Sequence, residues 1–162
     1  MSYSIPSQTR VGHVHLKVSD LQRSLDFYCG LLGFELVMKY GAQAAFISAG
    51  GYHHHIGLNT WHSLGSEPAP DRYPGLYHTA IVYPQRKDLA AILKRLLDAS
   101  YQQITGASDH GVSEAIYLND PDLNGVELYW DRPREFWPTD ETGSLTMYTR
   151  RLDTDNLLAE LQ

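Results

Sequence analysis

Residues 12–21 read GHVHLKVSDL, a strand pattern that continues directly into the start of a helix. Successive side chains of a strand point to opposite faces, so the valines and the leucine of this stretch share one apolar face. The opposite face carries His13, His15 and Lys17. A half-buried strand more often has Thr, Ser or Glu at such positions, and two imidazoles on one face indicate that chemistry takes place there.

A helix is expected directly after this strand. Ser19 occupies an N-cap position and Gln22 follows three residues later, which is a capping-box pattern. Gly33 is well placed to end the helix in the left-handed conformation. Apolar residues recur with helical spacing between these limits, at Leu21, Leu25, Tyr28 and Leu32.

Three strand-like runs follow the helix, over residues 34–40, 43–49 and 52–59. Single or paired glycines separate neighbouring runs, so both junctions are expected to be hairpins. Residues 11–59 are therefore predicted to form a βαβββ unit.

The same order of elements occurs a second time. After a Pro- and Gly-rich stretch at 60–74, which is typical of a surface linker, the pattern predicts one strand, one helix and three further strands. A repeat of this size is one supersecondary unit per copy, and the two copies place His13 and His78 at matching positions. The second set of elements is expected at residues 76–83, 86–99, 101–105, 114–118 and 126–130.

The chain is therefore predicted to be one α+β domain, residues 1–162, built from two tandem βαβββ modules. The modules cover 11–59 and 75–131, the linker covers 60–74, and a C-terminal extension with a short helix covers 132–162. The sequence leaves open whether this extension packs on its own domain or on a dimer partner.

Composition narrows the class of protein. A hydrophobic fraction of 43% with 20% charged residues is ordinary for a soluble globular domain. The net charge of -6 argues against a nucleic-acid partner, because phosphate binding needs a basic surface. No apolar run is long enough to span a bilayer, and the N-terminus lacks a secretory pattern. Cys29 is the sole cysteine, so no intrachain disulfide can form, and we expect a cytoplasmic protein.

Glu127, together with the two histidines at matching repeat positions, forms a candidate metal site. It lies mid-strand in residues 124–130, NGVELYW, where a carboxylate among bulky apolar neighbours is costly unless it is paired, protonated or bound to metal. With His13 and His78 it supplies two imidazoles and one carboxylate, the facial triad of non-haem Fe(II) oxygenases. Such a centre keeps adjacent positions open and stays net positive, which suits an anionic bidentate ligand such as a catecholate or enediolate.

Further polar residues could form a second layer around this site. The histidine run 53–55 lies in the fourth predicted strand, where parity places the two outer histidines on one face and His54 on the other. The pair Asp109-His110 precedes a strand that contains Tyr117. Imidazole and phenol groups near a metal carry protons and hydrogen-bond substrate oxygens.

Each of these residues also has a simpler structural interpretation. His15 and His54 are readily explained as structural histidines, and Glu127 alone could pair with Arg132 or Lys17. The conjunction of two histidines at equivalent repeat positions with one inward glutamate nevertheless favours a metal site.

At these residues the sequence resembles the vicinal oxygen chelate superfamily of glyoxalases, bleomycin-resistance proteins, fosfomycin thiol transferases and type I extradiol dioxygenases. The resemblance covers roughly residues 11–131 and rests first on HVHLKVSDL and on the SLDFY and LGF motifs that follow. It implies that the two modules form a half-open mixed β-barrel. The motifs that resemble the extradiol dioxygenase signature are Asp109-His110, Ile116-Tyr117, Asp120-Pro121 and Glu127.

The resemblance implies a role for each candidate residue. His55 would be the acid–base histidine, Tyr117 would hydrogen-bond a substrate oxygen, and His110 would be a second active-site histidine. The metal would be Fe(II), with Mn, Zn or Ni as alternatives. Its ligands would fall on His13, His78 and Glu127.

The implied function is an Fe(II)-dependent extradiol dioxygenase that cleaves a catecholic aromatic with O2. We expect a homodimer that binds a small aromatic and O2, with no nucleic-acid or membrane partner. The sequence departs from the signature at Leu123, where Gly or Pro is usual, and at Ser108. Well-known extradiol enzymes also carry two tandem domains, whereas one domain is expected here.

Two other functions fit the same superfamily. A glyoxalase-type lyase or isomerase usually has a glutamate in the fourth strand of a module, and residues 52–59 contain none, although Glu35 and Glu114 stay open as substitutes. Thiol transfer uses the same ligand types and also stays open. A non-catalytic drug-binding module is disfavoured, because such proteins typically lack the metal ligands.

Overall fold

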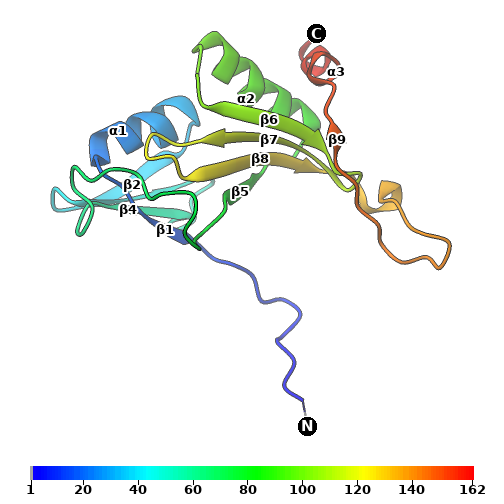
Figure 1. The fold of residues 1–162 in the computed structure, drawn as a ribbon, viewed down its shortest axis with the longest axis horizontal. Coiled ribbons are helices and arrows are strands. Elements are labelled where there is room, and N and C mark those ends of the chain that lie inside the picture. Colours follow the sequence, from blue (N-terminus) through cyan, green and yellow to red (C-terminus); the bar gives the residue numbers. More distant parts are fainter. Residues whose placement is uncertain (1) are drawn as a thin grey trace. The chain divides into compact units, whose positions relative to one another are not determined.

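The computed structural model describes residues 2–162 and divides into two compact units. The first unit ends at Glu67 and the second covers Pro68–Gln162, so the boundary falls within the expected linker. Each unit contains one mixed sheet with helical segments (Figure 1). The chain is thus α+β, as the sequence predicts. The single-domain organisation over the whole chain stays a prediction.

The first unit contains a four-stranded sheet in the order β1-β4-β3-β2. Strand β1 pairs in parallel with β4, and β3 pairs antiparallel with both β4 and β2. A short α-helix, α1, continues into a π-helical segment, η1, after β1. The elements are β1 (Val14–Lys17), α1 (Leu21–Leu25), η1 (Asp26–Leu31), β2 (Glu35–Tyr40), β3 (Ala44–Ser48) and β4 (Ile56–Asn59).

Asp20, and not Ser19, caps helix α1. The Asp20 carboxylate accepts a hydrogen bond from the Arg23 backbone N–H at 3.0 Å, whereas the Ser19 hydroxyl accepts one from the Arg23 guanidinium at 2.7 Å. Asp and Ser are comparable N-caps, so the choice between neighbouring residues depends on where the strand ends. The expected apolar stripe is buried, and Gly33 ends the segment at φ 89°.

Strand β4 is shorter than the sequence predicts, because it begins only at Ile56. Gly50 and Gly51 both have positive φ values, 64° and 77°, and the turn they form extends into residues 51–55. Period-two parity applies only within a strand, so it does not fix the directions of the three histidines at 53–55.

The second unit contains a five-stranded sheet in the order β5-β8-β7-β6-β9. Strand β6 begins later than expected, because Ser100 has φ 51° and the Tyr101 N–H bonds back to the Leu96 carbonyl at 3.0 Å, which closes the helix first. The elements are β5 (Thr79–Val82), α2 (Arg86–Asp98), β6 (Ile104–Asp109), β7 (Ser113–Asn119), β8 (Gly125–Asp131) and β9 (Arg150–Arg151).

The C-terminal extension packs on the second unit of the same chain. Strand β9 pairs antiparallel with the edge of β6, and helix α3 (Thr154–Leu158) buries Leu157 completely. The guanidinium of Arg86 in α2 donates to Glu160 at 2.7 Å and to Asn156 at 2.8 Å. Two short 3₁₀ segments complete the extension, η2 (Arg134–Phe136) and η3 (Ala159–Leu161).

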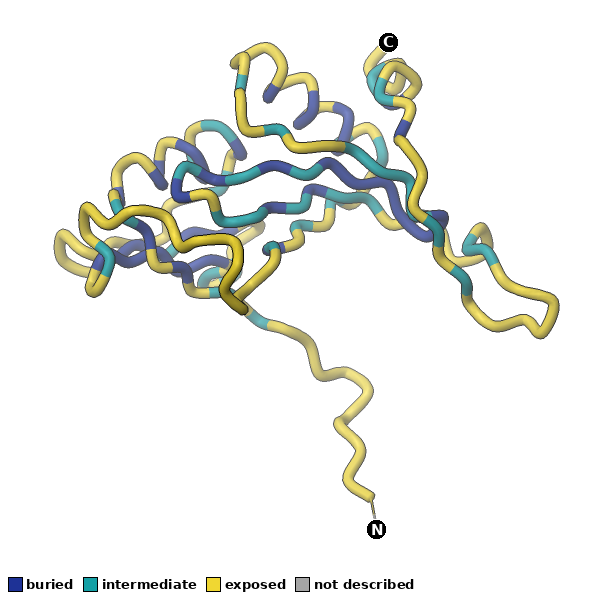
Figure 2. Tube along the Cα trace, in the orientation of Figure 1, coloured by how far each residue is buried: buried dark blue, intermediate teal, exposed yellow. Residues whose placement is uncertain are grey.

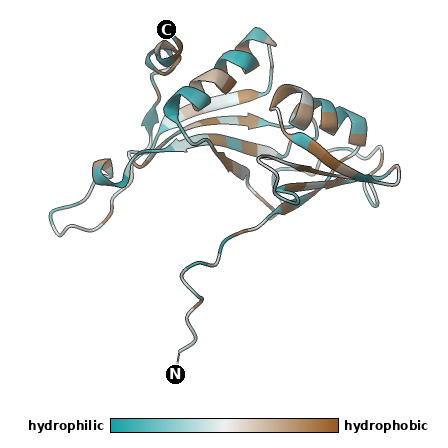
Figure 3. Cartoon of the chain, turned by 180° about the vertical axis from the view of Figure 1, so that it is seen from behind, coloured by the Kyte–Doolittle hydropathy of each residue, from teal (hydrophilic) through white to brown (hydrophobic). Residues whose placement is uncertain are grey.

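Buried residues lie mainly in the strands and on one side of α2 (Figure 2). Leu89, Leu93 and Leu96 are at most 4% exposed, whereas Leu97 is 51% exposed. Figure 3 shows the corresponding division of the helices into hydrophobic and hydrophilic sides. None of the described helices has the length and apolarity that crossing a bilayer requires.

Leu123 adopts a left-handed conformation, φ 64°, in the turn between β7 and β8. This conformation costs an L-residue roughly 1–2 kcal/mol, and its side chain is half exposed, so little packing offsets the cost. Leu123→Gly is therefore expected to raise the free energy of unfolding by about 0.5–1 kcal/mol in urea titrations, after the entropy of glycine is subtracted. Leu97→Gly, on the exposed side of α2, is the matched control and should lower stability by about 1 kcal/mol. Equal losses in the two variants would contradict strain at Leu123.

Candidate functional site

The second unit brings four of the six predicted site residues into one hydrogen-bonded network. His78 Nε2 lies 2.9 Å from Glu127 Oε2. The Tyr117 hydroxyl donates to Glu127 Oε1 at 2.9 Å. His110 Nε2 lies 2.7 Å from the same hydroxyl oxygen. The residues thus form a continuous chain from His110 through Tyr117 and Glu127 to His78.

Strand pairing explains how this network assembles. Tyr117 in β7 and Glu127 in β8 are direct cross-strand partners, so their side chains share a face of the sheet. His78 immediately precedes β5, which pairs in parallel with β8. Gly125 permits the close approach at this point, because a Cβ there would overlap the Tyr77 carbonyl oxygen and lie 3.1 Å from the His78 Cβ. A glycine opposite His78 is therefore part of the site's construction.

Burial and the carboxylates of Glu127 and Asp131 together set the electrostatics of this face. Burial, with the hydrogen bond to Glu127 and its negative charge, raises the pKa of Tyr117 well above its ordinary value. Burial and the charges of Asp131 and Glu127 raise the pKa of Tyr129. Burial and Glu127 also raise the pKa of Asp131. This face therefore has a negative potential that would attract a cation.

The first unit gathers histidines around His13. The ring centroid of His54 lies 4.4 Å from that of His13 and 5.0 Å from that of Phe46. His54 Nδ1 is 2.8 Å from His53 Nδ1. Burial, and then the neighbouring imidazoles beginning with His13, lower the pKa of His54. A lowered pKa keeps this imidazole neutral near pH 7, in the form that accepts a proton.

His55, the predicted acid–base histidine, has different surroundings. Its Nδ1 lies 2.9 Å from the Ser48 hydroxyl and accepts the Ala49 backbone N–H at 3.3 Å. Its ring lies 4.8 Å from that of Tyr52. Within the first unit the structure thus brings His54 against His13, a neighbour that the sequence did not identify. The only sequence signal was the histidine run itself.

His15 has the surroundings of a structural histidine. Its ring lies 5.8 Å from Phe46 and 5.6 Å from Trp61. A Cβ at Gly57 would come within 2.9 Å of the imidazole, so the ring lies directly over that glycine. Burial and the charge of His13 lower the pKa of His15.

The predicted metal ligands are divided between the two units, with His13 in the first and His78 and Glu127 in the second. Within each unit, the described residues contain no group of three His, Cys, Asp or Glu side chains that could hold a metal ion. The complete triad therefore stays a prediction that draws on both units.

The His78–Glu127 pair nevertheless fits a shared cation. Two ligand atoms about 2.1 Å from one ion at a right angle lie about 3 Å apart, close to the 2.9 Å between His78 Nε2 and Glu127 Oε2. His78 Nδ1 is buried and has no hydrogen-bond partner among the described residues. Nε2, which lies beside the carboxylate, is therefore the nitrogen that can share a cation with Glu127.

Arg132 belongs to a separate ion-pair cluster and does not neutralise Glu127. Its guanidinium donates to Asp109 at 2.7 Å and to Glu114 at 2.6 Å. Glu114 also accepts from Arg86 at 2.8 Å. Glu114, one glutamate that could have served a glyoxalase-type site, is thus held by two arginines.

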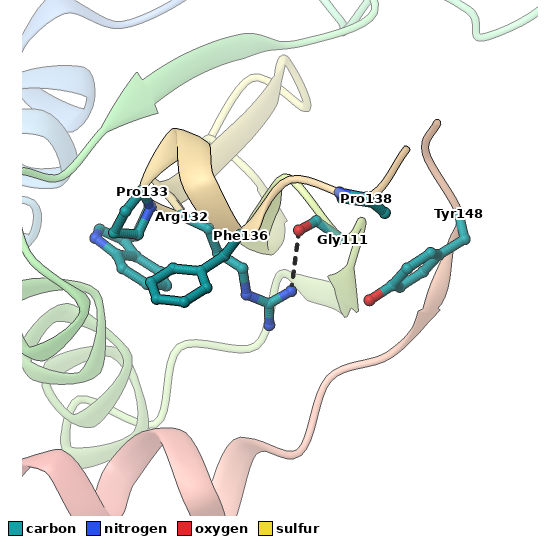
Figure 4. A pocket seen from close by; sticks show the side chains of 7 residues that line it. Gly111, Arg132, Pro133, Phe136, Pro138 and Tyr148 are labelled. Atoms are coloured by element: carbon teal, nitrogen blue, oxygen red, sulfur yellow. Dashed lines mark hydrogen bonds between the residues drawn. The ribbon is translucent and has the colours of Figure 1, made fainter. Parts of the chain in front are cut away.

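A cavity of about 460 Å³ adjoins this cluster in the C-terminal extension. Arg132, Phe136, Pro138 and Tyr148 are among its lining residues, and the rings of Phe136 and Tyr148 lie on either side of the Arg132 guanidinium in Figure 4. None of the predicted site residues lines this cavity.

Comparison with known proteins identifies the family. The family described as the Glyoxalase/Bleomycin resistance protein/Dioxygenase superfamily matches residues 10–128. Catechol-2,3-dioxygenase of Bacillus subtilis (strain 168) is 40% identical over 158 residues, which cover 97% of this chain and 54% of the relative. The chain thus spans about half the length of that protein. Biphenyl-2,3-diol 1,2-dioxygenase 3 of Rhodococcus globerulus is 29% identical over 91% of this chain and 75% of its own.

Solved structures share the fold. A glyoxalase/dioxygenase from Nostoc punctiforme superimposes with a TM-score of 0.66 at 18% identity, covering 82% of this chain and 99% of the other. A glyoxylase/bleomycin resistance protein/dioxygenase domain from Frankia sp. EAN1pec gives 0.65 at 23% identity, with 79% and 96% covered. At these identities the likeness concerns the fold alone.

Proposed function

The chain belongs to the Glyoxalase/Bleomycin resistance protein/Dioxygenase superfamily, and from this premise we propose that it is an Fe(II)-dependent extradiol dioxygenase acting on a catecholic aromatic. The observation that carries the proposal is the continuous network His110–Tyr117–Glu127–His78 in the second unit. The two relatives compared above are named as dioxygenases of vicinal aromatic diols, which supports the same reaction class.

His13, His78 and Glu127 are the proposed ligands, and Mn, Zn and Ni are the alternative metals. When bound, Fe(II) would supply a centre that accepts both oxygens of a catecholate and passes electrons to O2. One carboxylate against a dication leaves a net positive charge, which favours an anionic chelating substrate. The 2.9 Å between His78 Nε2 and Glu127 Oε2 and the negative potential around Glu127 support this assignment.

Tyr117 and His110 are the proposed polar contacts of the substrate oxygens. The Tyr117 hydroxyl already donates to Glu127, so it lies beside the proposed ligand, and its oxygen can accept a hydrogen bond from a substrate hydroxyl placed there. The raised pKa of Tyr117 keeps its proton on the phenol oxygen at neutral pH. His110 holds that hydroxyl from the other side.

One histidine of the run 53–55 is proposed to move the substrate proton. The family resemblance implied His55, whereas the contacts favour His54, because it lies against His13 and a lowered pKa leaves it neutral. We expect His54→Gln to lower kcat by roughly a hundredfold, at the low end for acid–base catalysis, while iron stays bound. His55→Gln is the matched comparison and should have a several-fold smaller effect, because its imidazole bonds Ser48.

Steady-state oxygen uptake with metal analysis of each variant checks this assignment. A large decrease of kcat in His55→Gln, with no decrease in His54→Gln, would show that His55 is the proton carrier. Loss of iron from either variant would mean that the residue is a ligand instead.

Anaerobic reconstitution with Fe(II), followed by catechol and O2, tests the proposed function. The expected result is stoichiometric O2 uptake with a coloured ring-opened product. Turnover of a hemithioacetal with Zn or Ni, and no O2 uptake with a panel of catechols, would overturn the proposal in favour of a glyoxalase-type enzyme. Light scattering on the same sample tests the proposed homodimer.

A further inference from the structure

The C-terminal extension reaches the network at His110. The Thr149 hydroxyl oxygen lies 3.2 Å from His110 Nδ1, and the Tyr148 carbonyl oxygen lies 3.2 Å from the same nitrogen. These contacts continue the pairing of β9 with β6, in which Asp109 is opposite Arg150 and Ser108 is opposite Arg151. The next pair in that register is His110 with Thr149, so the two side chains share a face.

Counting protons in the network fixes which nitrogen of His110 carries the hydrogen. A tyrosine hydroxyl has one proton to donate, and the Tyr117 proton goes to Glu127, which as a carboxylate can only accept. His110 Nε2 must therefore donate to the Tyr117 oxygen. In the neutral ring Nδ1 is then an acceptor, and of its two neighbours only the Thr149 hydroxyl can donate to it.

We propose that Thr149 is a positioning residue, whose hydroxyl holds His110 in the Nε2–H tautomer and so keeps the Tyr117 proton directed at Glu127. The role in catalysis rests on the proposed function, but the tautomer itself does not. Without this hydroxyl, the remaining contact of Nδ1 is the Tyr148 carbonyl, which accepts only from Nδ1–H. His110 Nε2 would then carry no hydrogen and would become an acceptor. The Tyr117 hydroxyl would donate to His110 Nε2 instead of to Glu127.

The surrounding chain holds Thr149 in place. The Tyr148 N–H donates to the His110 carbonyl at 3.3 Å, and the Arg150 guanidinium lies 4.2 Å from the centre of the Tyr148 ring. The Tyr148 ring packs over Gly111, where a Cβ would come within 2.7 Å of it. These contacts lie next to Thr149 and do not use its hydroxyl, so a change of that side chain should leave the segment in position.

Ring nitrogen shifts of ¹⁵N-histidine-labelled protein test the proposal without added metal. At about pH 8.5, where an ordinary imidazole is neutral, we expect His110 as Nε2–H in the wild type and in Thr149→Ser. Thr149→Val should convert it to Nδ1–H. Thr142→Val, a surface threonine whose hydroxyl bonds Asp140, is the control and should match the wild type. The His110 signals are assigned by their absence in His110→Gln. Persistence of Nε2–H in Thr149→Val would overturn the proposal.

Kinetics of the iron-loaded protein give a second readout. Loss of one positioning hydrogen bond is expected to lower kcat about fivefold with little change in KM, and Thr149→Ser should restore it. An unchanged kcat together with a changed tautomer would remove the catalytic role and leave the tautomer assignment standing. If the wild type cleaves no catechol, the proposed function fails, and the nitrogen shifts still decide the role of Thr149.

Discussion

Glu127→Gln is expected to lower the rate of catechol cleavage by more than about a thousandfold, because it removes the one anionic ligand and with it several kcal/mol of metal-dependent stabilisation. The amide has the same shape, and an amide oxygen can still accept from Tyr117, so the fold should survive. Oxygen uptake and iron content of the purified variant measure the effect, and circular dichroism checks the fold.

Glu141→Gln, at an exposed position in the C-terminal extension, is the matched control and should retain full activity. If Glu127→Gln keeps both iron and turnover within a few-fold of the wild type, Glu127 is not a ligand.

Arg132→Met is expected to lower the stability of the second unit. The arginine joins Asp109 and Glu114 and also donates to the Gly111 carbonyl at 3.3 Å, and the Glu114 side chain is only 6% exposed. Breaking a buried ion pair by removing one partner costs about 3–5 kcal/mol. Because Glu114 keeps Arg86 and Asp109 is partly exposed, we expect about 3 kcal/mol, at the low end of that range. Urea unfolding followed by tryptophan fluorescence measures it.

Arg134→Met, on the same segment but exposed, should change stability by less than about 0.5 kcal/mol. A comparable loss of stability in both variants would show that the ion pairs of Arg132 contribute little to stability beyond what an exposed arginine of this segment contributes.

The stability difference between wild type and Arg132→Met is expected to depend on pH in one direction. Burial opposes ionisation of Asp109, but the hydrogen bonds from Arg132 and the Gly111 N–H, with the arginine charges, lower its pKa overall. A carboxylate with a lowered pKa in the folded state stabilises the fold at pH values above the ordinary aspartate pKa of about 4. This stabilisation is lost as the pH falls through the folded-state pKa. The stability difference between wild type and Arg132→Met should therefore shrink below about pH 4.

Much of the site could be predicted from residue patterns. The alternation in residues 12–18 places His13 and His15 opposite Leu16 and Val18, which are buried. The repeat predicted the strands of the second unit and placed Glu127 within one of them, whereas the pairing of Tyr117 with Glu127 across β7 and β8 was not predicted. These predictions succeeded because regular strands impose their periodicity over many residues.

Predictions failed where a turn replaced a strand. A strand was expected from residue 52, but the positive φ values at Gly50 and Gly51 lengthen the turn. His53 and His55 both contact the Tyr52 ring, as parity grouped them, yet His53 Nδ1 also lies 2.8 Å from His54 Nδ1, a contact that strand alternation does not predict. Thr149 gave no local signal at all, because its contact with His110 depends on a short strand that returns to the sheet about forty residues later. Tertiary pairing of this kind is invisible to local periodicity.

Anaerobic equilibrium binding of Fe(II) to His13→Gln tests most directly whether His13, His78 and Glu127 hold one cation. The wild type should bind one iron per chain, and so should His62→Gln, an exposed histidine of the first unit that serves as the control. Loss of a residue that only supports a ligand typically costs 10–100-fold in metal affinity, so loss of His13 itself should cost more than about a hundredfold. Wild-type iron affinity in His13→Gln would contradict the account.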